Sequence, residues 1–464
     1  MESAPLLSDE LLRRLDRPGP RYTSYPTADR MDERFGAPEY RAALQQRAAR
    51  LGSGPAPALS VYVHVPFCES VCYYCACNKV VTRHHERAAD YLRLIEAEVA
   101  LHAAELGRGA AVSQLHLGGG TPTFLSDAEL DTLMATLGSA FALQPGAEVS
   151  IEVDPRTATP ARLAHLRGLG FNRVSFGVQD FDPAVQQAVH REQSLASVQA
   201  LIEAARGLGF ASINTDLIYG LPRQTPASFE RTVAQVAALR PDRIALYAYA
   251  HLPERFKPQR RIAAAELPEA GQRIRMLGGA IAGFIGHGYE YIGMDHFALP
   301  GDALAVARRE GRLHRNFQGY TTQPDCDLIG LGVSAIGRVG DTYSQNAKSL
   351  PEYGQALREG RFAVVRGVAL TPDDRLRRAL IMALMCQGRL SFEAVERAHG
   401  LRMHEAFADE LQALQGLADE GLVALRPDAV EVTPLGWYFV RTVAMTFDRR
   451  LRMQPGRTAY SRVA

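Results

Sequence analysis

Four of the six cysteines of this 464-residue chain fall within one short loop. Cys68, Cys72 and Cys75 form a C-x3-C-x2-C run, and Cys77 follows two residues later. A tight cysteine group of this kind favours metal or redox chemistry over a disulfide scaffold. Three thiolates can hold three irons of a four-iron cluster and leave the fourth iron open to a ligand. The run therefore predicts a reactive iron–sulfur cluster bound by Cys68, Cys72 and Cys75.

A structural zinc site is the alternative, because zinc takes four ligands and Cys77 and His64 are available to complete a set. The loop follows an expected strand and carries the aromatic Tyr74 just before Cys75, and both features favour the cluster. The spacing resembles that of the radical S-adenosylmethionine (SAM) superfamily. In that superfamily SAM binds the open iron, and one electron cleaves it to methionine and a 5′-deoxyadenosyl radical. The resemblance implies a 4Fe-4S cluster and SAM as cofactors.

Glycines and carboxylates stand at the ends of later strands. Gly118-Gly119-Gly120-Thr121 follows the second expected strand, and glycines let the backbone approach a ligand closely and offer N–H donors. This run resembles the superfamily motif that contacts the methionine end of SAM, although a simple turn is the alternative. Glu152 and Asp216 end two apolar strands and could accept hydrogen bonds from ribose hydroxyls. A helix cap or a surface charge is the alternative for such carboxylates.

Strands and helices alternate through the middle of the chain, which predicts a parallel α/β sheet. Six such units are too few for a closed eight-stranded barrel, so we expect an open, partial (β/α)6 barrel. In barrels of this kind the chemistry gathers at the C-terminal ends of the strands. The expected strands are residues 59–65, 113–117, 148–153, 173–178, 212–218 and 243–248.

We expect three segments along the chain. Residues 1–55 form an N-terminal extension and linker, with a helix at 9–16, an irregular run and the breaker-rich Gly52-Ser53-Gly54-Pro55. Residues 56–365 form the partial barrel, and residues 366–464 form a C-terminal helical domain.

The C-terminal segment resembles a winged helix, with several helices and one small β-hairpin. Its expected helices are 373–385, 392–398, 405–419 and 435–447, and its expected strands are 422–425 and 430–432. A fold alone does not determine function, and the hairpin carries Asp428 and Glu431 instead of a basic, aromatic stripe. We therefore expect this domain to pack as a lid and not to bind nucleic acid.

Composition is that of an ordinary globular protein, with 47% hydrophobic residues, 22% charged residues and a net charge of +1. This charge gives no general attraction to nucleic acid or to an anionic membrane. No stretch approaches the roughly 18 apolar residues of a membrane span. Residues 1–5 lack the basic and apolar regions of a secretion signal. We expect a cytoplasmic monomer.

Longer motifs resemble one family, the oxygen-independent coproporphyrinogen III oxidases, also called coproporphyrinogen dehydrogenases. The resemblance runs from Pro20 to the C-terminus. The motifs that carry it are Pro20–Thr27, Tyr62–Cys68, Cys75–Lys79, Ser175–Phe181, His190–Gln193, Asp216–Pro222, Tyr249–Pro253, Gly293–Phe297 and Asn316–Thr321.

The resemblance implies two SAM molecules side by side above the cluster. The residues implied to hold the SAM on the cluster are Tyr62, Gly119, Glu152 and Ile336. Those implied to hold the second SAM are Tyr74, Gly120, Thr121, Gln179, Arg191, Asp216 and Ala250. Arg191 has a physical rationale, because a guanidinium fork suits a carboxylate such as that of methionine. A surface arginine before a helix is its alternative.

The implied reaction is oxidative decarboxylation of two propionate side chains of coproporphyrinogen III to vinyl groups, which gives protoporphyrinogen IX in anaerobic haem biosynthesis. Hydrogen is removed from the propionate β-carbon, carbon dioxide leaves and one electron passes to an acceptor. An electron donor is required as a partner, and its identity is open. The sequence shows no nucleophile triad. Arg21, beside the substrate carboxylates, and Cys77, near substrate or the second SAM, are further candidates.

Three other functions compete with this reading. Haem-handling chaperones of the same superfamily typically have an aromatic residue at the position of Cys77 and lack the Arg21–Thr27 motif, so both features favour the dehydrogenase. A radical SAM methyltransferase with two SAM molecules would share the cluster but not the later motifs. A zinc-binding regulator that uses the C-terminal domain is disfavoured by Asp428 and Glu431.

Overall fold

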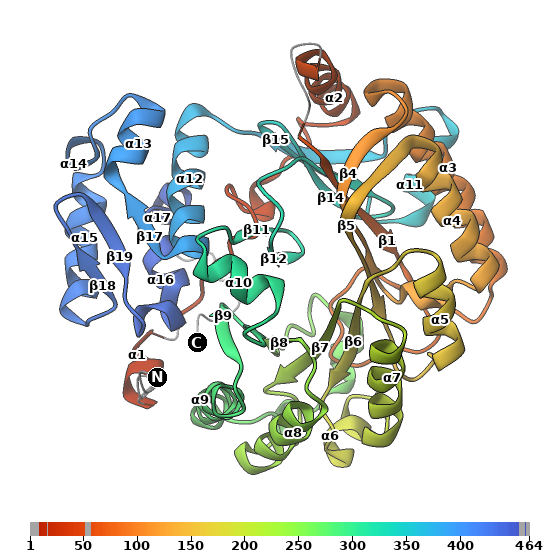
Figure 1. The fold of residues 1–464 in the computed structure, drawn as a ribbon, viewed down its shortest axis with the longest axis horizontal. Coiled ribbons are helices and arrows are strands. Elements are labelled where there is room, and N and C mark those ends of the chain that lie inside the picture. The colour runs from red at the N-terminus through yellow and green to blue at the C-terminus, as the bar shows by residue number, and fades with distance from the viewer. Residues whose placement is uncertain (1–8, 16, 52–56, 454–459, 461–464) are drawn as a thin grey trace.

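The computed structural model describes residues 9–15, 17–51, 57–453 and 460. The secretion-signal expectation for residues 1–5 and the linker Gly52-Ser53-Gly54-Pro55 lie outside these residues. Figure 1 shows a curved sheet with helices on its outer face, and a second, mostly helical part beside it. None of the helices within the described residues is long and apolar enough to cross a membrane.

Six parallel strands form the central part of a twelve-stranded sheet, side by side in chain order. They are β1 (Leu59–Val65), β4 (Ala110–Gly119), β5 (Phe141–Val153), β6 (Arg173–Gln179), β7 (Ser212–Tyr219) and β8 (Arg243–Ala248). The helices of this part are α3 (Glu86–Leu106), α4 (Asp127–Ala140), α5 (Pro160–Gly168), α6 (Pro183–Ala188), α7 (Leu195–Gly207), α8 (Pro226–Leu239) and α9 (Ala270–Gly286). The expected partial (β/α)6 barrel is confirmed.

Alternation along the strands separates the core from the lumen of the barrel. In β6 the apolar side chains of Val174, Phe176 and Val178 are buried in the core. The residues between them, such as Ser175 and Gln179, line an internal cavity. Because side chains alternate with a period of two, one strand contributes both to the core and to a polar lumen.

Short strands extend the sheet at both edges, and the sequence analysis did not predict them. β13 (Leu328–Leu331) pairs in parallel with β1, and β14 (Ile336–Val339), β15 (Thr342–Asn346) and β16 (Val364–Ala369) continue from it in antiparallel order. At the other edge β10 (His296–Ala298) pairs with β8, and β9 (Glu290–Gly293) pairs with β10. The remaining elements here are β11 (His314–Asn316), β12 (Gly319–Thr321), α10 (Ala303–Arg309), α11 (Leu350–Arg358), η3 (Lys257–Arg261) and η4 (Ala264–Glu266).

The N-terminal segment corrects one expectation. α1 (Asp9–Leu15) is present as expected, but the run expected to be irregular contains η1 (Ala28–Arg30) and the fifteen-residue helix α2 (Ala37–Leu51). Tyr40 and Leu44 are buried on one face of α2, and the Tyr40 hydroxyl lies 2.9 Å from Nε2 of His102 in α3. Because only this narrow stripe of a polar helix is buried, its pattern is weak in the sequence.

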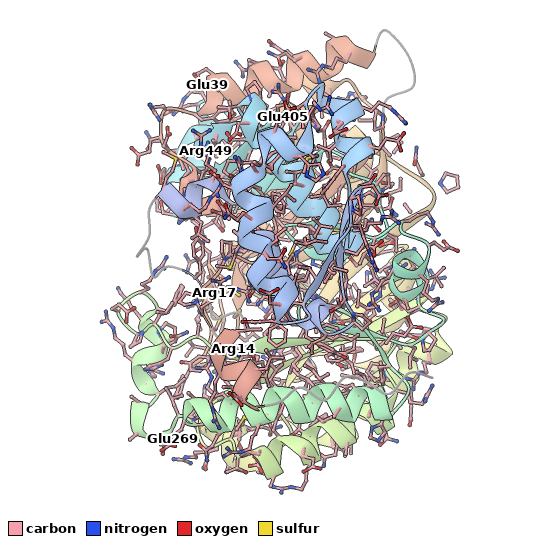
Figure 2. All side chains as sticks on the ribbon, turned by 90° about the vertical axis from the view of Figure 1, so that its left-hand side faces the viewer. Arg14, Arg17, Glu39, Glu269, Glu405 and Arg449 are labelled. Carbon is pink, nitrogen blue, oxygen red and sulfur yellow. The ribbon has the colours of Figure 1, made fainter. Side chains whose placement is uncertain are left out.

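The C-terminal part packs beside the barrel, and α1 contacts the barrel helix α9. Figure 2 shows the molecule from the side of the C-terminal part, with α1 above α9. Its elements are α12 (Pro372–Gln387), β17 (Arg389–Ser391), α13 (Phe392–His399), α14 (Met403–Ala406), α15 (Ala408–Asp419), β18 (Val423–Leu425), β19 (Ala429–Val432), η5 (Gly436–Phe439), α16 (Val440–Met445) and α17 (Arg449–Met453). The expected hairpin gains a third strand, β17. The expected helices at 405–419 and 435–447 are each divided, into α14 and α15 and into η5 and α16.

Candidate active site

The cysteine loop leaves the C-terminal end of β1 and is closed by two short parallel strands, β2 (Phe67–Cys68) and β3 (Val80–Val81). The amide of Val80 donates to the Pro66 carbonyl at 2.7 Å, and η2 (Pro122–Phe124) lies nearby after the glycine run. All four cysteines of the loop line one cavity of about 420 Å³, which continues into the lumen of the barrel. The fold therefore places the thiols at the mouth of an enclosed space.

Two arginines direct N–H groups at one of these sulfurs. Nη1 of Arg191 lies 3.4 Å from Sγ of Cys72, and Nη2 of Arg156 lies 3.6 Å from the same atom. Both arginines also bind the buried carboxylate of Asp154. The two arginines are therefore held by one carboxylate with N–H groups directed at the Cys72 sulfur.

The neighbouring thiols differ in their electrostatics. A hydrogen bond from Cys77 lowers the pKa of Cys75 to about 6, with a smaller contribution from Lys79. Burial raises the pKa of Cys68 to about 11, although its sulfur lies 3.4 Å from the hydroxyl of Thr121. The thiolate, which is the form that binds metal, is thus favoured at Cys75, whereas Cys68 favours the protonated thiol.

The alternative zinc site is not formed by this geometry. Both ring nitrogens of His64 are engaged, with Nδ1 3.0 Å from the Tyr62 hydroxyl and Nε2 2.9 Å from the Asn78 carbonyl. In the part of the chain that the structure describes, no three His, Cys, Asp or Glu side chains converge on a site for a single ion. Three cysteines on one cavity wall suit a cluster, which is held through separate irons.

The glycine run is pressed against the cysteine loop. A Cβ atom on Gly120 would lie 2.6 Å from the carbonyl oxygen of Pro66. Gly119 has φ +126°, and its amide donates to Oε2 of Glu152 at 3.1 Å. Both positions therefore require glycine, and together they form a wall of backbone beside the thiols.

A pair of carboxylates gives the adjacent wall a negative character. Asp216 accepts hydrogen bonds from Ser175 at 3.0 Å and from Asn214 at 2.9 Å. Burial, together with the charge of Glu152, raises the pKa of Asp216 to about 6. This wall suits a ligand that carries hydroxyl donors and a positive charge, as SAM does.

Gln179, at the end of β6, has φ 67°, in the left-handed region that side chains other than glycine rarely adopt. Its Oε1 atom is buried without a hydrogen-bond partner in the described part of the chain. Strained backbone of this kind concentrates at functional sites, and an unpartnered buried acceptor suits a ligand that donates a hydrogen bond.

Comparison with known proteins identifies the family. The model of the radical SAM superfamily matches residues 62–236, and that of the HemN C-terminal domain matches residues 370–439. The oxygen-independent coproporphyrinogen III oxidase of Pseudomonas aeruginosa is 49% identical over 444 residues, 95% of either chain. The Escherichia coli K12 enzyme of the same name is 49% identical over 453 residues, 98% of this chain and 97% of its own. This chain belongs to the oxygen-independent coproporphyrinogen III oxidases.

The solved structure of coproporphyrinogen III oxidase (HemN) from Escherichia coli, described as a radical SAM enzyme, agrees. It superposes with a TM-score of 0.88 at 48% identity and covers 93% of this chain and 98% of its own. Membership of the radical SAM superfamily brings a 4Fe-4S cluster and SAM as cofactors. The predictions of family and cofactors are thus confirmed, while the presence of two SAM molecules remains a prediction.

Most residues predicted for this family's site share one cavity. Its lining includes the three cluster cysteines, Cys77, and eight of the eleven residues predicted to bind SAM: Tyr74, Gly119, Gly120, Thr121, Glu152, Gln179, Arg191 and Asp216. These residues are brought together from five parallel strands and from the loops that follow them.

The other three predicted residues, Tyr62, Ala250 and Ile336, lie outside the lining. The ring of Tyr62 stacks on His116, which does line the cavity. The carbonyl of Ala250 accepts a hydrogen bond from Gln259. Ile336 begins β14, two strands away from Tyr62.

The substrate candidate Arg21 also lies outside the lining. It forms an ion pair with Asp295, and its guanidinium lies 5.4 Å from the centre of the Tyr247 ring. Tyr247 lines the cavity, so Arg21 stands behind its wall. The sequence analysis missed a further group of lining residues, Arg243, His296 and Gln318. His296 and Gln318 lie within the family motifs Gly293–Phe297 and Asn316–Thr321, and this was the only feature of the sequence that pointed to them.

Proposed function

We propose that this chain catalyses the oxidative decarboxylation of two propionate side chains of coproporphyrinogen III to vinyl groups, giving protoporphyrinogen IX. One observation supports this most strongly. The cysteine triplet, the glycine wall and the carboxylate pair face a single cavity in a chain 49% identical to enzymes of that name over nearly its whole length.

Cys68, Cys72 and Cys75 hold the cluster in this proposal. When bound, the cluster and SAM supply the 5′-deoxyadenosyl radical that removes a hydrogen from the propionate β-carbon. The chain's own part is to bind, orient and exclude water. That hydrogen transfer moves a hydrogen atom and not a proton, so it needs no general base.

The SAM on the cluster is held by Tyr62, Gly119, Glu152 and Ile336 in this proposal. A second SAM is held by Tyr74, Gly120, Thr121, Gln179, Arg191, Asp216 and Ala250. The buried, unpartnered oxygen of Gln179 and the raised pKa of Asp216 support a ligand at the second position. The reaction needs an electron donor and an electron acceptor from outside the chain.

We further propose a cytoplasmic monomer. Its segments are residues 1–55, 56–365 and 366–464, with the last closing over the barrel. Hydrogen bonds across that boundary support the closing role: Trp437 Nε1 donates to the Ile292 carbonyl at 3.0 Å, and the Tyr320 hydroxyl donates to the Met385 carbonyl at 2.9 Å.

The test is anaerobic incubation of the reconstituted protein with coproporphyrinogen III, SAM and a reductant. We expect 5′-deoxyadenosine and protoporphyrinogen IX, the latter detected after oxidation by chromatography. SAM cleavage without loss of propionates would contradict the substrate. Tight haem binding without any decarboxylation would favour the chaperone function instead.

A further inference from the structure

The cavity extends away from the cysteines into the lumen of the barrel, where three lining side chains carry unsatisfied hydrogen-bonding groups. Nη2 of Arg243, Nδ1 of His296 and Nε2 of Gln318 are buried and have no hydrogen-bond partner among the described residues. All three residues line the cavity. Buried polar groups are nearly always satisfied, so three unpartnered nitrogens on one wall indicate a missing ligand.

These nitrogens come from three segments that meet. Arg243 begins β8, and His296 on β10 pairs with Ala245, the next inward position of the same strand. A Cβ atom on Gly319 would lie 3.4 Å from His296 Nε2, so the turn that carries Gln318 closes against this histidine. The three side chains thus converge at one end of the lumen.

The surroundings of this end favour an anion. The carboxylates nearest to it are already paired: both oxygens of Asp302 lie 2.9 Å from Nε of Arg243, and Glu148 binds Arg173 at 3.2 Å. Arg315 is 5% exposed, and among the described residues it forms no ion pair.

Burial and the charge of Arg315 lower the pKa of His296 to about 3, so its ring is neutral and can donate one N–H. A ligand here meets the unpartnered nitrogens of His296 and Gln318 and a spare guanidinium nitrogen of Arg243, while Arg315 does not line the cavity and adds positive charge from behind its wall.

We propose that Arg243, His296 and Gln318 bind a carboxylate of the substrate, namely a propionate that is not reacting. This inference rests on the proposed function, since coproporphyrinogen III carries four such groups. The carboxylates of Glu152 and Asp216 come from β5 and β7, whereas Arg243 and His296 come from β8 and β10, further along the sheet. Anchoring one propionate at Arg243, His296 and Gln318 turns another towards the cluster.

Gln318→Leu and His296→Phe test the site. Each should raise the KM for coproporphyrinogen III about tenfold or more, because each removes a hydrogen bond to a charged group. The iron content and the affinity for SAM should stay near those of the wild type. The melting temperature should not fall, because Nε2 of Gln318 and Nδ1 of His296 have no hydrogen-bond partner among the described residues. A merely structural role predicts the opposite pattern.

Gln323→Leu is the matched control, since this residue follows β12, five positions after Gln318, and does not line the cavity. A wild-type KM in both Gln318→Leu and His296→Phe, or a loss of SAM affinity in place of substrate affinity, would overturn this inference and leave the proposed function standing. If His296→Phe fails to fold, Gln318→Leu decides. A wild-type protein that does not convert coproporphyrinogen III would overturn this inference together with the proposed function.

Discussion

The guanidinium of Arg191 binds both carboxylate oxygens of Asp154, with Nη1 3.3 Å from Oδ2 and Nη2 3.2 Å from Oδ1. Its remaining N–H groups donate to the Gly177 carbonyl and to Cys72 Sγ. All five donors of the side chain are therefore engaged within the protein. A SAM carboxylate can bind Arg191 only by displacing one of these acceptors, so Asp154 competes with the ligand.

Arg191→Ala should destabilise the fold by about 1–3 kcal/mol at neutral pH, because Asp154, 8% exposed, keeps only Arg156 as an ion-pair partner. Burial alone would raise the pKa of Asp154, but Arg191 and then Arg156 hold it below its usual range. The ionised Asp154 therefore stabilises the folded protein at pH values above the ordinary aspartate pKa. This stabilisation is lost as the pH falls through the lowered pKa that Asp154 has in the folded state.

Urea unfolding of both proteins at pH 7 and near pH 3 measures this difference, which should shrink at the lower pH. Binding of labelled SAM should show the second equivalent weakened about 10–100-fold, with the first retained. Arg397→Ala, which removes an exposed arginine on α13, should change neither quantity. Wild-type binding of both equivalents to Arg191→Ala would contradict the two-SAM assignment.

Cys68→Ala, Cys72→Ala and Cys75→Ala should each lose the cluster and SAM cleavage, whereas Cys77→Ala should keep its iron and lose turnover. Cys77 acts on Cys75 through a hydrogen bond that favours the thiolate, so its loss changes the thiol without removing a ligand. Iron analysis and visible spectra after anaerobic reconstitution distinguish the variants. Full iron and activity in Cys72→Ala would overturn the cluster assignment, and iron loss in Cys77→Ala would make Cys77 a ligand.

Local patterns explain what could be predicted from the sequence. α3 (Glu86–Leu106) is an example, because its apolar stripe continues over 21 residues and is visible in the sequence. The cysteine loop was predictable because its chemistry depends on spacing within eight residues. The C-terminal ends of parallel strands converge, which brought Glu152 and Asp216 to one wall.

Non-local contacts explain what was missed. β14 to β16 are strands of four to six residues that pair with each other and join the barrel through β13 and β1, and so short a strand carries no clear pattern. His296 and Gln318 meet Arg243 from segments over fifty residues away along the chain. The partners of Arg191 are 14, 37 and 119 residues away along the chain, and the sequence therefore suggested a free arginine where the structure has a fully engaged one.

Gly120→Ala should destabilise the protein by about 1–3 kcal/mol, because the added methyl group would meet the backbone of Pro66 and Phe67 at 2.6–2.8 Å. Relief requires the cysteine loop to move, so cluster content should also fall. Gly138→Ala is the control: nothing lies within 4 Å of its Cβ position on α4, and the change should stabilise the helix by about 0.5–1 kcal/mol. Equal unfolding free energies for the two variants would refute the close approach.

Asp216→Asn should stabilise the protein more at pH 7.5 than at pH 4. The pKa of Asp216 is about 6 in the folded state and about 3.9 when unfolded. Between these values the unfolded chain releases a proton that the folded protein keeps, so the wild type loses stability as pH rises from about 4 to about 6. Melting curves should show a gain on the order of 2 °C at the higher pH only. A pH-independent effect would show that the carboxyl titrates normally.

Arg156 should adjust the reduction potential of the cluster through Cys72. Its Nη2 atom lies 3.6 Å from Sγ, and two hydrogen bonds to Asp154, at 3.0 and 2.7 Å, fix its position. Hydrogen bonds to ligand sulfurs stabilise the reduced cluster, which carries more negative charge, and so raise its potential.

Arg156→Met removes the donor and the charge and should lower the potential by roughly 30–60 mV, where 59 mV is a tenfold change for one electron. Anaerobic titration followed by electron paramagnetic resonance measures this without SAM or substrate. Iron content should be unchanged, and Arg167→Met, an exposed arginine on α5, should leave the potential unaltered. Arg156→Lys separates the two causes, because it keeps the charge but not the fork that reaches both Asp154 and Cys72. A potential in Arg156→Lys as low as that of Arg156→Met assigns the effect to the hydrogen bond, and a wild-type potential in both variants would contradict the role of Arg156.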